Sequence, residues 1–268
     1  MALITLEDLR LDCGRVVPRI VEFIRAHVEA ARARGVVVGL SGGVDSTTAA
    51  YLAVKSLGSE RVRALIMPDS RVTPPRDVED ARNVARKLGV KTYEVDIGRI
   101  LDSYRDSMAF FDPSHLVAQG NLRARIRMCV LYYLANLEGL LVLGTGDKSE
   151  LLIGYFTKYG DGGVDILPLG DLYKTQVRQL ALYLGVPREI ALKPSTPALW
   201  TGQTAEGELG MKYEEIDLVL YALFDRGLRP EEVPEATSVS KEKVETILRW
   251  VEESEHKRKM PPICKLAT

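Results

Sequence analysis

An unbroken apolar run, residues 36–40 (Val-Val-Val-Gly-Leu), ends at Ser41-Gly42-Gly43 and is followed directly by a helix-forming stretch that reaches Gly58. A strand that is apolar at every position has both faces buried, which is typical of a parallel sheet covered by helices on both sides. The glycine-rich turn then lies at the carboxyl end of that strand, where open α/β sheets bind their ligands.

Strands and helices alternate along the first two thirds of the chain. The helix at 16–34 shows helical spacing of Val17, Ile20, Val21, Ile24 and Val28. The pattern predicts strands at 36–40, 62–67, 92–95 and 140–143, and helices at 16–34, 44–58, 77–88, 118–137 and 171–184. This alternation predicts an α/β fold with a doubly wound, mostly parallel sheet flanked by helices.

No strand pattern is found after about residue 195. Two further helices are predicted near 213–226 and 240–254, the second with Ser240 as its N-cap. We therefore expect a single domain over 1–268, with a core at 16–195 and a small helical C-terminal extension at 196–268.

Composition excludes several functional classes. Lys and Arg number 36 against 37 Asp and Glu, a net charge of −1, whereas nucleic-acid binders normally carry an excess of basic residues. The three cysteines are far apart and form no CxxC pair, which argues against a disulfide framework or a zinc cluster. The chain shows no signal-peptide pattern and no apolar stretch of membrane-spanning length. We expect a cytoplasmic protein with neither nucleic acid nor membrane as a partner.

The turn after the first strand has the properties of a phosphate cradle. Glycines allow backbone N–H groups to approach an anion closely, and the positive end of the following helix points to the same place. Neither Gly-Lys-Ser/Thr nor GxGxxG is present, which excludes the two best-known phosphate-binding turns. The residues of this predicted phosphate cradle are Gly39, Leu40, Ser41, Gly42, Gly43, Val44, Asp45 and Ser46, and the resemblance described next implies that they contact ATP.

The segment Ser-Gly-Gly-Val-Asp-Ser at 41–46 resembles the signature of the N-type ATP pyrophosphatases, or PP-loop family. Members of this family cleave ATP between the α and β phosphates and transfer AMP to an oxygen atom of the substrate. A nitrogen or sulfur nucleophile then displaces AMP. The resemblance implies a fold like that of the adenine nucleotide α-hydrolases, with Asp45 helping to hold Mg²⁺.

Downstream segments resemble the NAD synthetases within that family. Gly144–Glu150 is similar to their GTxxxxE segment, and residues 156–163 (FTKYGDGG) are similar to their most specific stretch. The resemblance covers about 16–260. It implies that Thr145, Lys174 and Thr196 contact ATP, and that Glu150 binds Mg²⁺ with Asp45. Asp45, Lys174 and Glu150 are accordingly the expected catalytic residues.

The same resemblance assigns a second group of residues to deamido-NAD (nicotinate adenine dinucleotide). The segment Gly120–Met128 is similar to the family's GNxxAR helix start, and residues 256–257 are similar to its C-terminal His-Lys pair. The implied contacts are Arg125, Lys158, Asp165, His256 and Lys257. A simpler interpretation of Lys158 and Asp165 is a mutual ion pair that orders a glycine-rich loop.

The family's activity is the ATP-dependent amidation of deamido-NAD by ammonia, which yields NAD, AMP and pyrophosphate through an adenylated carboxylate. Its members are homodimers, and we expect the interface at the 118–137 helix and the preceding 100–117 segment. A separate glutaminase that supplies ammonia is possible but not indicated.

Three alternatives remain open from sequence. The chain could be another PP-loop adenylating amidotransferase, a tRNA-modifying enzyme, or a nonenzymatic ATP-binding regulator. Individual residues also have structural interpretations. We expect Arg123 and Arg127 to lie on a solvated helix face, and Lys174 could be an ordinary surface lysine. Ile126, Val130, Tyr133, Leu134 and Leu137 are expected on one side of their helix.

Overall fold

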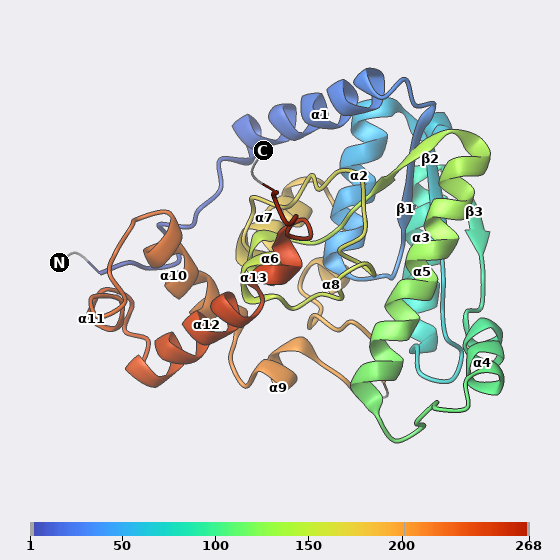
Figure 1. Ribbon diagram of the computed structural model, residues 1–268. Helices are drawn as coiled ribbons and strands as arrows, with labels where there is room; N and C mark the ends of the chain where they lie inside the picture. Colours follow the sequence, from blue (N-terminus) through green and yellow to red (C-terminus); the bar gives the residue numbers. More distant parts are fainter. Residues whose placement is uncertain (1–2, 201, 267–268) are drawn as a thin grey trace.

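The computed structural model describes residues 3–200 and 202–266, and Figure 1 shows a sheet with helices packed on both of its faces. Four parallel strands lie in the order β3-β2-β1-β4. They are β1 Gly35–Gly39, β2 Val62–Ile66, β3 Lys91–Glu94 and β4 Leu140–Leu143. The predicted fold class is confirmed, and each predicted strand is found at or directly beside its expected position.

The strand order places a topological switch point between β1 and β4. The chain adds β2 and then β3 on one side of β1, whereas β4 pairs with the other side, with Val36 opposite Leu141. A further parallel bridge joins Leu143 to Ile166. Connections on the two sides of such a point leave in opposite directions, and the crevice between them is the preferred ligand site of open α/β sheets.

Successive residues of β1 face opposite layers, as expected for a strand. Val36 and Val38 pack in the core that contains α1 Cys13–Ala30, α2 Val44–Leu57, α3 Pro75–Leu88 and α7 Lys174–Tyr183. Val37 packs on the opposite face against α4 Gly98–Ser107 and α5 Leu116–Glu138. The apolar run at 36–40 is therefore buried on both faces, as predicted.

The C-terminal helices build a separate apolar cluster beside the sheet (Figure 1). Ile4 and Leu9 of the N-terminal segment belong to it, and Ile4 N–H donates to Ala236 O at 2.7 Å. Its main helices are α6 Lys148–Ile153, α10 Tyr213–Phe224, α11 Val233–Thr237 and α12 Lys241–Glu253. The remaining short helices are η1 Ser59–Arg61, α8 Arg188–Ala191, α9 Ala205–Leu209 and α13 Glu255–Arg258. Within 3–200 and 202–266, no helix is both long and apolar enough to cross a membrane.

Helix boundaries differ from the prediction where caps decide them. The first helix begins at Cys13 rather than 16, because the Asp12 side chain accepts a hydrogen bond from Arg15 N–H. The helix predicted from 171 begins at Lys174. Ser240 is confirmed as an N-cap, since its hydroxyl accepts from Lys243 N–H.

The apolar side chains predicted on one side of α5 are divided between the core and the surface. Leu134 is buried, but Tyr133 is 73% and Leu137 68% exposed. This helix is apolar around much of its circumference, so spacing alone does not define which side faces the sheet. The exposed aromatic and aliphatic side chains of α5 continue onto the segment before it, where Phe110 is 84% exposed.

Candidate active site

The two serines of the glycine-rich turn form hydrogen bonds that fix its conformation. Ser41 N–H donates to Ser46 Oγ at 3.2 Å, the two hydroxyl oxygens are 3.0 Å apart, and Gly43 N–H donates to Ser41 Oγ at 3.3 Å. Gly42 adopts a left-handed conformation (φ +79°), and a Cβ there would lie 2.2 Å from Asp77 O. Only glycine fits at that position, so α3 can pack directly against the turn.

A cavity of about 490 Å³ lies over this turn and the neighbouring strand ends. Its walls come from the 39–46 turn, the end of β2, the middle of α5, and the loops around 144–164 and 193–203. The predicted ATP and metal residues that line it are Gly39, Leu40, Ser41, Gly43, Val44, Asp45, Ser46, Thr145, Glu150 and Thr196. The structure therefore brings together segments that lie far apart in the sequence.

Lys174 lies beneath one side of this cavity and is fully buried. Its Nζ is 2.8 Å from Asp45 Oδ2, 3.0 Å from Asp147 Oδ2 and 2.7 Å from Glu150 Oε1. The Tyr213 ring covers it, with the centroid 5.2 Å from Nζ. The interpretation of Lys174 as an ordinary surface lysine is wrong, because the first turn of α7 points its side chain into the carboxylates.

The charges in this cluster act on one another. Burial alone lowers the pKa of Lys174, but Asp147, Asp45 and Glu150 together raise it well above its usual value. Burial raises the pKa of Asp147 and of Glu150, and the Lys174 cation opposes that rise. When all three carboxylates are ionised, the cluster carries an excess of negative charge, which a further cation would offset.

Asp147 is a member of this cluster that the sequence analysis did not include. Its side chain caps α6 by accepting from Glu150 N–H at 2.9 Å, and its other oxygen faces Lys174. An aspartate directly before a short helix indicates a cap, but no local pattern shows that the same carboxylate meets a lysine at the start of the next long helix. The contact between Asp147 and Lys174 depends on how the β4–α6 connection packs against the start of α7.

Asp217 of α10 fixes the position of Lys174 from behind. It accepts from Ser149 Oγ at 2.5 Å and from Thr175 N–H at 2.8 Å, while Ser149 Oγ accepts from Lys174 N–H at 2.9 Å. Burial raises the pKa of Asp217 to about 7. The C-terminal helices thus orient the residue that contacts all three carboxylates, and sequence analysis had no signal for this role.

Lys193 supports the turn from the opposite side. Its Nζ lies 2.5 Å from Asp77, 2.7 Å from Asp80 and 3.4 Å from Gly42 O. Thr196, further along the same loop, donates its hydroxyl proton to Gln203 O at 2.6 Å. Lys193 therefore ties α3, the turn and the 193–203 loop together at one edge of the cavity.

The predicted deamido-NAD residues lie mainly outside the cavity lining. Arg125 is exposed and donates to Lys158 O at 3.3–3.4 Å, and Lys158 Nζ donates to His256 O at 2.7 Å. Lys257 is the member that lines the cavity, where its Nζ donates to Gly154 O at 2.7 Å and to Phe156 O at 3.0 Å.

Asp165 completes this predicted group from the end of the same loop. Its carboxylate accepts from Tyr132 OH at 2.9 Å and from Val142 N–H at 2.7 Å. Lys158 is directed instead to the backbone of α13. The alternative in which Lys158 and Asp165 form an ion pair with each other is therefore wrong.

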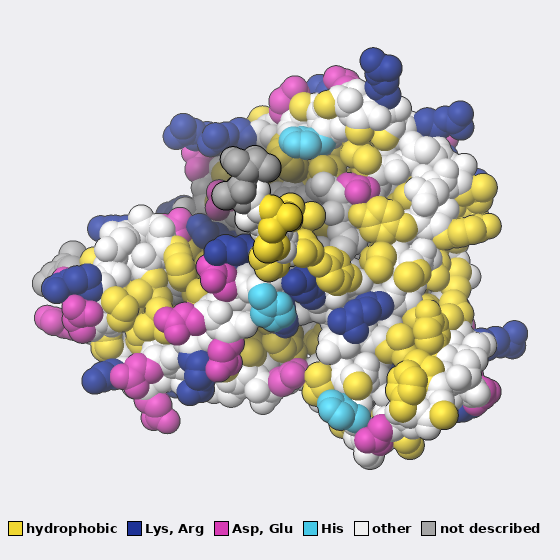
Figure 2. All heavy atoms as spheres, in the orientation of Figure 1, with side chains coloured by type: hydrophobic (Ala, Val, Ile, Leu, Met, Phe, Trp, Pro, Cys, Tyr) yellow, Lys and Arg dark blue, Asp and Glu magenta, His cyan; other side chains and the backbone are white. Residues whose placement is uncertain are grey.

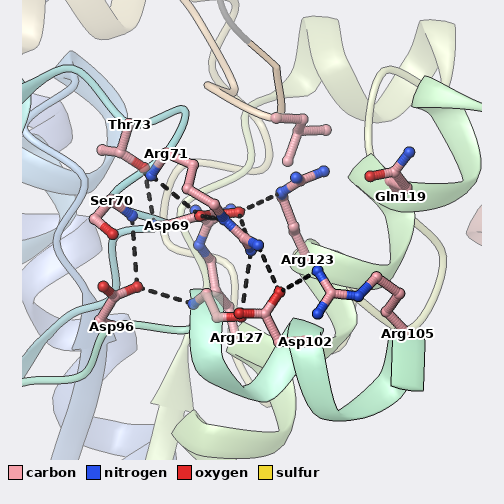
Figure 3. Close-up of polar contacts among 12 residues, drawn as sticks. Asp69, Ser70, Arg71, Thr73, Asp96, Asp102, Arg105, Gln119, Arg123 and Arg127 are labelled. Atoms are coloured by element: carbon pink, nitrogen blue, oxygen red, sulfur yellow. Dashed lines mark hydrogen bonds and ion pairs between the residues drawn. The ribbon is translucent and has the colours of Figure 1, made fainter. Parts of the chain in front are cut away.

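The expectation that Arg123 and Arg127 lie on a solvated face is also wrong. Arg123 is buried, and its Nε donates to Asp69 at 2.8 Å (Figure 3). Arg127 Nε donates to Met67 O at 3.0 Å, and the residue lines the cavity. Two arginines four apart share a helix face, but here that face packs against the β2–α3 connection.

Known proteins with similar sequences place this chain in a family. The NAD synthase family model matches residues 16–261. The chain belongs to the NAD synthase family. The NH(3)-dependent NAD(+) synthetase of Hyperthermus butylicus is 61% identical over 97% of this chain and 94% of that protein. The enzyme of the same name from Staphylothermus marinus is 55% identical over 98% of this chain and 96% of its own length.

Solved structures of NAD synthases and a related enzyme have the same fold. The NMN synthetase of Francisella tularensis superposes with a TM-score of 0.85 at 36% identity, covering 96% of this chain and all of that one. The NH3-dependent NAD synthetase of Campylobacter jejuni gives a TM-score of 0.80 at 31% identity, covering 96% and 100%. The names of these two enzymes differ, one being an NMN synthetase and the other an NAD synthetase.

Proposed function

We propose that this protein converts deamido-NAD to NAD with ammonia, at the expense of ATP, which leaves as AMP and pyrophosphate. One observation supports the proposal most strongly. The 41–46 turn lines the same cavity as Asp45 and Glu150, the two carboxylates that pair with the buried Lys174. Relatives that are 43–61% identical over nearly full length bear the name NH(3)-dependent NAD(+) synthetase. They favour the dinucleotide over a mononucleotide substrate.

Two bonds form and two break in the proposed reaction. A nicotinate carboxylate oxygen attacks the α-phosphorus of ATP, and the bond to the bridging oxygen of pyrophosphate breaks. Ammonia then attacks the activated carbonyl carbon, AMP departs with the oxygen that joined the two groups, and the nitrogen loses a proton. Rate enhancement comes mainly from positioning and from fixed charges placed around the phosphates.

The 41–46 turn supplies the backbone N–H groups and hydroxyls that hold the departing pyrophosphate. The first turn of α2 lies directly behind it, so the positive end of that helix faces the same oxygens. Lys174 keeps its positive charge because of its three carboxylate neighbours. We infer that it approaches the phosphates from the β4 side when nucleotide is bound.

Asp45 and Glu150 fit the needs of Mg²⁺. Asp45 Oδ1 is buried without a hydrogen-bond partner among the described residues, and both carboxylates border the cavity. The described ranges contain no group of three or more His, Cys, Asp or Glu arranged to enclose a metal. Mg²⁺ needs only one or two carboxylates when phosphate oxygens and waters complete its shell. Bound there, it would polarise the α-phosphate and the pyrophosphate oxygens.

The test uses the purified protein with Mg²⁺–ATP, ammonium chloride and one acceptor at a time. The acceptors are deamido-NAD, nicotinate mononucleotide, xanthosine phosphate and tRNA. We expect NAD, AMP and pyrophosphate in equal amounts with deamido-NAD, and at least tenfold lower kcat/KM with the mononucleotide. Pyrophosphate release that depends on tRNA or xanthosine phosphate would contradict the proposal, as would ATP binding without turnover.

We also propose that the protein is a homodimer, that it acts in the cytoplasm, and that its nitrogen donor is free ammonia. Hydrophobic side chains run along α5 and the segment before it on the face seen in Figure 2. Exposed apolar patches of this kind mark association sites. The side chains concerned are Phe110, Leu116, Val117, Tyr133 and Leu137.

Light scattering at micromolar concentration is expected to give a mass twice that of one chain. Changing Tyr133 and Leu137 together to Glu should shift the mass to that of one chain, because two carboxylates would be desolvated at the contact. The control is the same pair of changes at the exposed Leu182 and Tyr183 of α7. A monomeric native protein would contradict the proposed interface.

Replacing Arg125 with alanine is expected to weaken the binding of deamido-NAD much more than that of ATP. Arg125 donates to the Lys158 carbonyl outside the cavity lining. We expect its guanidinium to donate to deamido-NAD as well, and the loss of such a charged hydrogen bond costs about 1.5–3 kcal/mol, or roughly ten- to a hundredfold in affinity. Steady-state KM values for both substrates provide the measurement. Equal effects on the two substrates would count against the assignment of Arg125.

A further inference from the structure

Four arginines gather where α5 meets the β2–α3 connection, and the carboxylates beside them are already engaged. Asp69 is fully buried and lies between Arg71, at 2.8 Å, and Arg123, at 2.8 Å (Figure 3). Asp102 accepts from Arg71 at 2.6 Å and from Arg105 at 3.0 Å. The fourth arginine, Arg127, takes part in no ion pair with any residue that the structure describes.

Arg127 is instead held by one neutral contact. Its Nε donates to Met67 O at 3.0 Å, which leaves the two terminal nitrogens of the guanidinium as free donors beside the cavity, as far as the described residues show. Burial lowers the pKa of Arg127 to about 10, and Asp69 and Asp161 offset this only from beyond ion-pair distance. Arg127 is half-buried, and a partly desolvated cation without a paired anion is stabilised when a ligand with negative charge binds beside it.

Arg127 and Lys174 lie on opposite sides of the glycine-rich turn. Lys174 meets the turn from the β4 side, whereas Met67, the anchor of Arg127, directly follows β2. A Cβ at Gly39 would lie 3.4 Å from Met67 Cε and 3.7 Å from Leu131 Cδ1. Leu131 is one helical turn beyond Arg127 on α5, so Arg127 borders the start of the turn on its β2 side.

The wall around Arg127 differs in character from the wall around Lys174. Leu65, Met67, Met128 and Leu131 line the cavity on the Arg127 side, with the carboxylate of Asp161 near enough to act on Arg127. Asp45 and Glu150 line the Lys174 side. An apolar wall accepts the flat face of a purine, and a guanidinium beside it supplies donors for phosphate, ribose or ring acceptor atoms. The charged wall suits the metal and the transferring phosphates.

We propose that Arg127 binds the adenylate half of ATP, donating from its free terminal nitrogens while Met67 O fixes its Nε. This assignment rests on the proposed function. It places the nucleoside and α-phosphate over the β2 end of the cavity and the departing pyrophosphate over residues 41–46. Asp69 acts indirectly: by pairing with Arg123, one turn earlier on α5, it anchors the helix that presents Arg127.

The test is the binding of three probes to Arg127→Met, measured by titration calorimetry. The probes are α,β-methylene-ATP, pyrophosphate and deamido-NAD. We expect the affinity for α,β-methylene-ATP to fall at least tenfold, as for the loss of a charged hydrogen bond. Pyrophosphate and deamido-NAD should stay within threefold of the native values, and Arg127→Lys should lie between native protein and Arg127→Met.

Arg249→Met provides the matched control, because Arg249 is an exposed arginine of α12 and the change removes the same charge. Unchanged α,β-methylene-ATP binding in Arg127→Met, or an equal loss for pyrophosphate or deamido-NAD, would overturn the proposal. If Arg127→Met fails to fold, Arg127→Lys and Arg127→Gln decide by the same criteria.

Turnover by the native protein distinguishes a failure of the Arg127 assignment from a failure of the proposed function. If the native protein makes NAD, AMP and pyrophosphate while the Arg127 variants bind all three probes normally, the Arg127 assignment alone fails. If the native protein makes none of these products, the proposed function fails as well.

Discussion

Replacing Lys174 with methionine is expected to remove nearly all activity, lowering kcat at least about a thousandfold, and to lower the free energy of unfolding by about 3–5 kcal/mol. Methionine fills a similar volume but leaves Asp45, Asp147 and Glu150 facing one another without their shared cation. Buried like charges repel, so at least one of the carboxylates will take up a proton. Thermal unfolding and single-turnover release of pyrophosphate measure the two effects separately.

Two further variants make the Lys174 result specific. Lys241→Met removes a lysine from the exposed surface of α12 and should leave both stability and turnover unchanged. Lys174→Arg keeps the charge but spreads it over a larger planar group, so we expect most of the stability and little of the activity. Near-native turnover in Lys174→Met would contradict the placement of this lysine beside the reacting phosphates.

Changing Asp45 to asparagine is expected to lower kcat about a hundred- to a thousandfold and to raise the Mg²⁺ concentration needed for half-maximal rate. The change keeps the shape of the side chain but removes the charge from the oxygen that lacks a partner among the described residues. A neutral amide is a much weaker ligand for Mg²⁺ than a carboxylate. The fold should survive, because Lys174 retains Asp147 and Glu150 as partners.

Titration of the rate against Mg²⁺, with ATP held constant, measures this effect. Asp171→Asn is the matched control, since the Asp171 side chain is 99% exposed and lies at the end of the segment that leads into α7. An unchanged Mg²⁺ dependence in Asp45→Asn would refute the metal role of Asp45. Glu150→Gln should behave in the same way as Asp45→Asn.

The sheet and its ligand-binding edge could be predicted because their signals are local. The apolar run at 36–40 and the glycines that end it specify a buried strand and a tight turn within one short stretch of sequence. Regular alternation of short apolar runs with helical spacing then leaves few topologies. Strand positions, the place of the turn and the family resemblance all follow from patterns that need no knowledge of distant contacts.

Features that depend on distant contacts could not be read in the same way. The solvated face predicted for Arg123 and Arg127 ignored Asp69, which is distant in the sequence and reaches Arg123 only through the packing of α5 on the sheet. The burial of Lys174 likewise requires the turn after β1, the segment after β4 and the start of α7 to pack against one another. Tyr133 and Leu137 follow the apolar pattern of a core but lie on the outer side of α5.

An oxygen-18 transfer experiment tests the central claim most directly. Deamido-NAD carrying ¹⁸O in both carboxylate oxygens is incubated with unlabelled ATP, ammonium and the native protein, and the products are examined by mass spectrometry. Attack of the carboxylate at the α-phosphorus predicts one ¹⁸O in every AMP and none in pyrophosphate. Formation of ADP and orthophosphate, or AMP without label, would contradict the account.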